Sequence, residues 1–315
     1  MLKQFAIAQV QKAADRGRSR IYQEGVLREC VQMSVLRTLS EKGAFSHIAF
    51  MGGTALRFLY RSRRFSDGVD LAATSDRFRR FSEDVDLTLE EGAHDFGTWI
   101  EAAGRQLEQA GFEGVKFSVN LKTTVVKAEL VLPGLLREAK LASMKEQKLM
   151  VKVEMDTNPP VGAGFQQTMI TSPDSPIAVR CHDLPTLMAG KIAALVMRPY
   201  IKARDWYDLD FYSDYLERGV RPNLALLQDA IRQNSARTKQ PEWAAAEWLL
   251  HVERRLRGKE FPESLSEGIR GFLEDAVQAE SLTRDRLLQV VDRIERATGA
   301  SGSSIEQTPS LKPSL

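Results

Sequence analysis

The pattern of apolar and polar positions divides the chain into a mixed N-terminal half and a helical C-terminal half. Helical spacing of apolar residues predicts an amphipathic helix over residues 21–42, which Gly43 ends. A short apolar run at residues 47–51 predicts a buried strand, and Gly52 and Gly53 then lead into a second helix. Further strands are predicted at residues 85–90, 115–121, 124–131 and 149–156, with a helix over 94–110.

After Pro176 the pattern is helical, and prolines separate the segments. The predicted helices cover residues 184–197, 202–217, 224–233, 243–256, 265–279 and 282–297. Strands that are grouped early and followed by helices favour an α+β fold over a doubly wound parallel sheet. We expect an α/β domain over residues 1–178, a helical domain over 179–300, and a flexible Ser- and Pro-rich tail over 301–315.

Composition narrows the class of protein. The 315 residues are 43% hydrophobic and 27% charged, which is typical of a soluble globular protein. The net charge is only +2, so any basic function must be local. Two cysteines cannot form a disulfide framework, and four histidines cannot support a His-rich metal site. With no signal peptide and no membrane-spanning run in the sequence, we expect a cytoplasmic protein without a membrane partner.

A Gly-Gly-Thr turn between a predicted strand and a predicted helix is the first candidate for chemistry. Gly52 and Gly53 would let backbone N–H groups approach a phosphate closely. The helix N-terminus and the Thr54 hydroxyl would add to that anion site. The alternative is a tight turn with no ligand.

Two alternating acidic patterns are the second candidate. Asp84 and Asp86 are two residues apart on a predicted strand, so their side chains share one face. Their mutual repulsion indicates a divalent cation, and oxygen ligands favour Mg²⁺ or Mn²⁺. Glu154 alternates with Asp156 on a later strand and could supply a third carboxylate. In each case the alternative is a solvated charged face.

Charged residues on two predicted helices are the third candidate. Lys191 lies among small apolar residues, where a cation needs an anionic partner. On the next helix, Arg204, Asp205 and Asp208 share a face by their spacing. An ordinary salt-bridged helix pair is the alternative.

These motifs occur in the order that is typical of nucleotidyltransferases of the DNA polymerase β superfamily. The segments GGTALRFLY, RFSEDVDL and KVEMD, with the Lys191 and RDWYDL helices, closely resemble the AbiEii/AbiGii family. That family contains bacterial nucleotidyltransferase-like toxins, and the mycobacterial MenT enzymes belong with it. The resemblance covers residues 21–215 and implies a polymerase-β-like mixed sheet with flanking helices, followed by an all-helical C-terminal region.

The resemblance also implies roles for individual residues. It assigns triphosphate binding to Gly52, Gly53 and Thr54, metal binding to Asp84 and Asp86, and the third acid to Glu154. The family's essential lysine corresponds to Lys191, and its aspartate late in the sequence corresponds to Asp205, which follows Arg204. We expect Lys191 and Arg204 to hold the β- and γ-phosphates of the NTP. The implied substrate is an NTP. The implied acceptor is the 3′ end of tRNA or another RNA, and the implied partner is an antitoxin that regulates transcription.

A tandem duplication interrupts the family pattern. Residues 61–71 (RSRRFSDGVDL) and 77–87 (RFRRFSEDVDL) are identical at eight of eleven positions. The first copy has the usual family spacing, but Gly68 stands where the first metal-binding aspartate belongs. We expect the second copy to form the metal-site strand and residues 61–76 to be an extruded insertion. The competing view places the first copy in that strand, with Asp70 as a ligand.

The whole pattern predicts a metal-dependent nucleotidyltransferase that acts as a toxin. Two other activities stay open, a kinase-like phosphoryl transfer from the same site and a degenerate nucleotide-binding regulator. An arginine-dense stretch predicts a basic rim for RNA, with plain solubility as the alternative. Its members are Arg57, Arg61, Arg63, Arg64, Arg77, Arg79 and Arg80.

Overall fold

A seven-stranded mixed sheet, in the order β3-β4-β5-β2-β1-β7-β6, forms the N-terminal half of the computed structural model. The structure describes residues 2–60, 80–92, 94–144 and 147–298. β2 is antiparallel to β1 and parallel to β5, while β1 is parallel to β7. The strands are β1 (Ile48–Met51), β2 (Asp84–Leu89), β3 (Lys116–Asn120), β4 (Val125–Pro133), β5 (Lys148–Asp156), β6 (Phe165–Ile170) and β7 (Ile177–His182).

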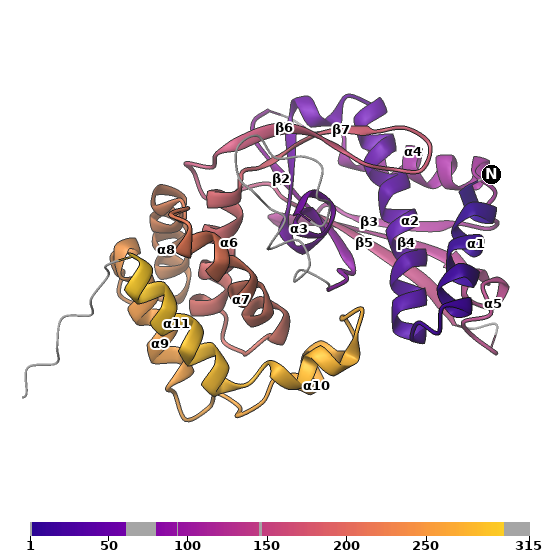
Figure 1. Cartoon of the computed structure of the whole chain (residues 1–315). Coiled ribbons are helices and arrows are strands. Elements are labelled where there is room, and N and C mark those ends of the chain that lie inside the picture. The colour runs from indigo at the N-terminus through magenta and orange to yellow at the C-terminus, as the bar shows by residue number, and fades with distance from the viewer. Residues whose placement is uncertain (1, 61–79, 93, 145–146, 299–315) are drawn as a thin grey trace, which may run out of the picture.

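Helices cover the sheet and make up most of the described residues after β7 (Figure 1). α1, α2 and α4 pack together beside β3, β5 and β7, whereas α3 packs on β1 and β2 and touches α6. The helices are α1 (Leu2–Asp15), α2 (Arg20–Glu41), α3 (Gly52–Tyr60), α4 (Phe96–Gln109), α5 (Leu135–Glu138), α6 (Leu184–Met197), α7 (Ala203–Glu217), α8 (Leu224–Thr238), α9 (Trp248–Leu256), α10 (Ser266–Arg270) and α11 (Arg284–Thr298). Short 3₁₀ turns lie at Ala44–Ser46, Ala245–Glu247 and Ala276–Ser281.

The two central strands β2 and β5 have one apolar face and one polar face because their residues alternate. The apolar face is buried in the main core and carries Val85, Leu87, Val153 and Met155. The opposite face carries Asp84, Asp86, Thr88, Glu154 and Asp156. Asp86 lies opposite Glu154 in the register, and Thr88 lies opposite Asp156. Alternation alone therefore gathers the polar side chains on one surface.

The C-terminal segment returns to this part of the sheet. Phe81 donates its backbone N–H to the carbonyl of Phe272 over 2.6 Å, and Arg80 forms an isolated bridge with Leu273. Gln32 of α2 donates to the carbonyl of Ser82 from the other side. The chain immediately before β2 is therefore held by segments from both ends of the protein.

The expected α+β class and most expected elements are confirmed. The prediction of helix throughout after Pro176 is wrong at residues 177–182, which form β7, and β6 was not predicted. Ile177, Val179 and Cys181 do alternate, but that run is short and directly precedes a long helical pattern. The expected helix at 265–279 is broken, because α10 ends at Arg270 and the following backbone pairs with Phe81.

The expected domain division stays a prediction. Its boundary at residue 178 falls within β7, and the expected tail lies outside the described residues. In the described part of the chain, no helix combines the length and apolar character that a membrane crossing needs.

Residues 84–87 of the second copy lie in β2, next to β1 and β5, as expected. The competing view, in which that copy is displaced from the strand, is therefore wrong. The first copy, with Gly68 and Asp70, lies outside the described residues.

Candidate active site

A cavity of about 360 Å³ lies over the polar face of the sheet, between the start of α3 and helices α6 and α7. Eight of the nine expected site residues line it: Gly52, Gly53, Asp84, Asp86, Glu154, Lys191, Arg204 and Asp205. The ninth, Thr54, is fully buried, and its hydroxyl donates to the carbonyl of Asp84. The structure thus brings the expected residues together, while their chemical roles stay predictions.

The turn between β1 and α3 admits only glycine at its first position. Gly52 has a φ of +77°, and a Cβ atom there would collide with the carboxylate of Asp86. At Gly53, a Cβ atom would lie 2.5 Å from Nη2 of Arg80. The missing side chains therefore allow the start of α3 to approach both an acidic and a basic group.

Asp84 and Asp86 form a pair of carboxylates with few compensating contacts. Burial is the main reason, and the charge of the Asp84 carboxylate the second, why the pKa of Asp86 is raised to about 6. Burial, and next Glu83, also raises the pKa of Asp84. Glu154 lies opposite Asp86 but makes an ion pair with Lys127 at 2.9 Å.

This donor set fits Mg²⁺. No group of three or more acidic, His or Cys side chains in the described ranges converges as a complete metal site. Mg²⁺ is usually bound by one or two carboxylates, with water and substrate phosphates completing its shell. Asp84 and Asp86 would supply those carboxylates, and a cation would offset the burial and the repulsion from Asp84 that together raise the pKa of Asp86.

Buried ion pairs connect α6, α7 and the segment before β2. Nζ of Lys191 lies 2.7 Å from Asp205 and 2.8 Å from Asp208. Burial alone would lower the pKa of Lys191, but the carboxylates of Asp208 and Asp205 outweigh it and raise that pKa. Arg198 adds a contact to Asp205 at 2.5 Å, and Arg80 pairs with Asp208. The salt-bridged helix pair is thus present, and it also forms a wall of the cavity.

Two further cations line the same end of the cavity. Lys202 makes no ion pair within the described part of the protein, and its pKa is lowered by burial and by Arg204 and Arg198. Arg204 lies 4.2 Å from the ring centre of Phe272 and 3.3 Å from Glu83. Sequence reasoning missed Lys202, although it directly precedes the motif that contains Arg204.

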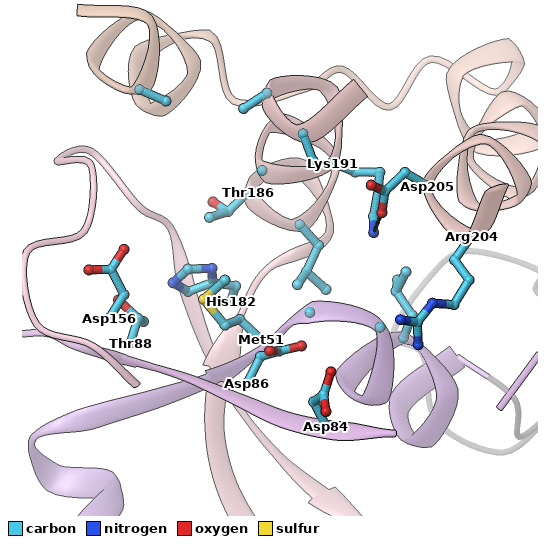
Figure 2. A pocket seen from close by; sticks show the side chains of 18 of the residues that line it. Met51, Asp84, Asp86, Thr88, Asp156, His182, Thr186, Lys191, Arg204 and Asp205 are labelled. Carbon is cyan, nitrogen blue, oxygen red and sulfur yellow. Dashed lines mark hydrogen bonds and ion pairs between the residues drawn. The ribbon is translucent and has the colours of Figure 1, made fainter. Parts of the chain in front are cut away.

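The other end of the cavity is polar but not cationic. Figure 2 shows Asp156, Thr88 and His182 on the side away from Arg204. Burial lowers the pKa of His182 to about 4, so its ring is neutral near pH 7. Sequence reasoning noted Asp156 without giving it a role and missed the other two. Thr88 continues the alternation of Asp84 and Asp86, whereas His182 ends the unpredicted strand β7.

The expected basic rim is wrong at both of its described members. Arg57 is 1% exposed and pairs with Glu29 at 2.5 Å and Glu274 at 2.6 Å. Arg80 is 2% exposed and pairs with Asp208. Both guanidinium groups thus bind carboxylates inside the protein. The remaining five arginines lie outside the described residues.

Comparisons with known proteins place the chain in a family. A family model described as "Nucleotidyl transferase AbiEii toxin, Type IV TA system" matches residues 34–297, from α2 into α11. Among solved structures, the Bradyrhizobium diazoefficiens CD-NTase CdnG in complex with GTP is similar at 13% identity, covering 95% of this chain and 75% of that one, with a TM-score of 0.19. No curated protein matches the chain. Since the family model spans the sheet, the cavity and the helical region together, the chain is a nucleotidyltransferase and belongs to the AbiEii toxin family of type IV toxin–antitoxin systems.

Proposed function

We propose that this enzyme transfers a nucleoside monophosphate from an NTP to the 3′ end of an RNA, with tRNA as the acceptor and Mg²⁺ as the cofactor. One observation carries the proposal. Asp84 and Asp86 lie beside the Gly52–Gly53 turn, in a cavity whose far wall holds Lys191, with Arg204 nearby. Nucleotidyl transfer requires a pair of carboxylates close to a glycine turn that can bind phosphate and close to several cations.

Each part of the cavity has a task in this proposal. The N–H groups at the start of α3, together with Lys202 and Arg204, bind the β- and γ-phosphates. Lys191 adds positive charge from the buried ion-pair network. Asp84 and Asp86 would hold Mg²⁺, which would neutralise charge on the α-phosphate and lower the pKa of the acceptor hydroxyl.

Glu154 is a further carboxylate near the pair, and it lies opposite Asp86 in the strand register. We assign to it the acceptance of the proton from the acceptor hydroxyl. A carboxylate can serve as the general base for that hydroxyl, and the Glu154 side chain also makes an ion pair with Lys127 at 2.9 Å.

As a toxin of this family, the enzyme would stop translation by blocking tRNA ends. It would be made in the cytoplasm together with a cognate antitoxin that regulates transcription. The family's description as the toxin of a type IV toxin–antitoxin system supports the antitoxin partner.

The test is to incubate the protein with total tRNA, Mg²⁺ and each NTP, labelled first on the α-phosphate and then on the γ-phosphate. We expect the α-label, and not the γ-label, on RNA. Asp86→Asn should abolish labelling, whereas Asp174→Asn, which changes an exposed carboxylate that does not line the cavity, should not. A γ-label on protein serine would indicate kinase-like transfer instead. NTP binding without any product would indicate a degenerate regulator.

A further inference from the structure

Among the residues that the structure describes, two buried polar atoms at one end of the cavity have no hydrogen-bond partner. They are Oγ1 of Thr88, a residue that is 1% exposed, and Nε2 of His182, a residue that is 6% exposed. Buried polar groups are almost always paired, because leaving one unpaired costs about 1–3 kcal/mol. Two such atoms lining one cavity therefore indicate a ligand that supplies the missing partners.

The sheet places a third polar group beside them. Asp156 lies opposite Thr88 across the β2–β5 pairing. One of its oxygens, Oδ1, accepts the backbone N–H of Asn158, which leaves Oδ2 for a ligand. His182 ends β7, and its ring packs on Phe165 with 5.4 Å between ring centres, which fixes its orientation.

Thr186 lies beside His182 at this end, but its hydroxyl already accepts the backbone N–H of Gly164, and the other lining side chains are mostly apolar (Figure 2). The side chains of Pro159, Pro160, Leu187, Leu226 and Ala230 line the cavity together with the three polar groups. Apolar walls with a few placed polar groups suit a planar heterocycle. The carboxylate of Asp156 disfavours a phosphate here, so neither the triphosphate nor an RNA backbone fits this end.

We propose that Thr88, Asp156 and His182 form the nucleobase subsite for the NTP and that Asp156 selects bases with an exocyclic amino group. This inference rests on the proposed function. Asp156 accepts a hydrogen bond from the amino group of cytosine, adenine or guanine, and Thr88 and His182 bond to the rest of the base edge. Uracil presents a carbonyl oxygen where cytosine has its amino group. The Asp156 carboxylate and the uracil carbonyl are both acceptors and cannot form a hydrogen bond with each other, so UTP binds more weakly than the other NTPs.

The test compares CTP with UTP, which differ on this edge, by binding to the full-length protein in the presence of Mg²⁺. Inorganic tripolyphosphate is the third ligand, because it reports on the phosphate end alone. We expect CTP to bind roughly tenfold or more tightly than UTP. Asp156→Asn should reverse that order, since its amide can donate to the uracil carbonyl. Asp174→Asn is the matched control and should keep the wild-type order.

Two more variants test the orphaned atoms. Thr88→Val and His182→Phe should weaken CTP binding roughly tenfold each while leaving tripolyphosphate binding unchanged. Equal binding of CTP and UTP by the wild type, or an unchanged order in Asp156→Asn, would overturn the inference and leave this end a water-filled space. If neither an NTP nor tripolyphosphate binds, the proposed function fails and the inference fails with it.

Discussion

Both carboxylate oxygens of Asp208 contact the guanidinium group of Arg80, with Oδ1 at 2.6 Å from Nε and Oδ2 at 2.6 Å from Nη2. The Asp208 side chain is fully buried, and that of Arg80 is 3% exposed. A two-pronged pair of this kind fixes orientation as well as charge. It joins the residues just before β2 to α7, and so it sets the carboxylate strand against the helix that carries Asp205.

We expect Arg80→Ala to lower the free energy of unfolding by about 3–5 kcal/mol, because it leaves part of the buried Asp208 charge without a partner. Urea denaturation measures the change. The control is Arg105→Ala, which removes an exposed ion pair with Glu101 and should cost less than about 1 kcal/mol. Equal losses in the two variants would mean that burial of the Arg80 pair has no energetic importance.

Gly52→Ala should reduce nucleotidyl transfer by about 100-fold, because its Cβ atom would displace the carboxylate of Asp86. Gly134→Ala is a matched control. Gly134 has a similar φ of +73°, but a Cβ atom there meets nothing within 4 Å. Both variants should lose about 1–2 kcal/mol of stability from backbone strain, and only the first should lose activity. Initial rates and melting curves on both proteins distinguish these effects.

His182 predicts a loss of stability in acid. Its pKa is about 4 in the folded protein against 6.5 for a free histidine, so between these values the unfolded chain takes up a proton that the folded protein excludes. The contribution of His182 to the free energy of unfolding is therefore complete above pH 6.5, and it falls by about 3 kcal/mol as the pH drops to 4. Denaturation of wild type and His182→Gln across this range measures the difference. In His182→Gln this decrease in the free energy of unfolding should be absent. In His47→Gln, which changes an exposed histidine, the decrease should remain.

Deleting residues 61–76 should leave a folded and active enzyme. The deletion joins Tyr60 to Arg77 and restores GGTALRFLYRFRRFSEDVDL, the spacing that the family pattern implies. It retains the whole second copy, whose residues 84–87 lie in β2. Surface insertions cost only roughly 0.6 kcal/mol for each doubling of loop length, so their removal is tolerated.

Asp70→Ala should be nearly silent in the same transfer assay, because Asp86 occupies the equivalent position in β2. An insoluble deletion variant, or an inactive Asp70→Ala enzyme, would show that the first copy is part of the working structure.

The features that sequence predicted correctly are local ones. Asp84 and Asp86 share a face because side chains alternate along a strand. Lys191 required a nearby anion because its neighbours are apolar, and Asp205 and Asp208 supply it. In both cases a few adjacent residues determine the outcome.

The features that sequence missed depend on partners far along the chain. In the sequence, Arg80 resembles one of several surface arginines, because only the fold brings Asp208 next to it. Residues 177–182 become a strand because β1 and β6 lie on either side of them. His182 enters the cavity only through that pairing, so no local pattern could have identified it.

The strand order has a consequence for synthesis. β1 receives β7, from the middle of the chain, as its second neighbour, and Phe81 is held by Phe272, so early residues pair with residues that are made much later. While a ribosome is still translating the helical region, the carboxylate strand lacks the backbone bond to Phe272 and the cations of α7 are newly made. The active centre is therefore completed late in translation, and a prematurely terminated chain leaves the ribosome without it.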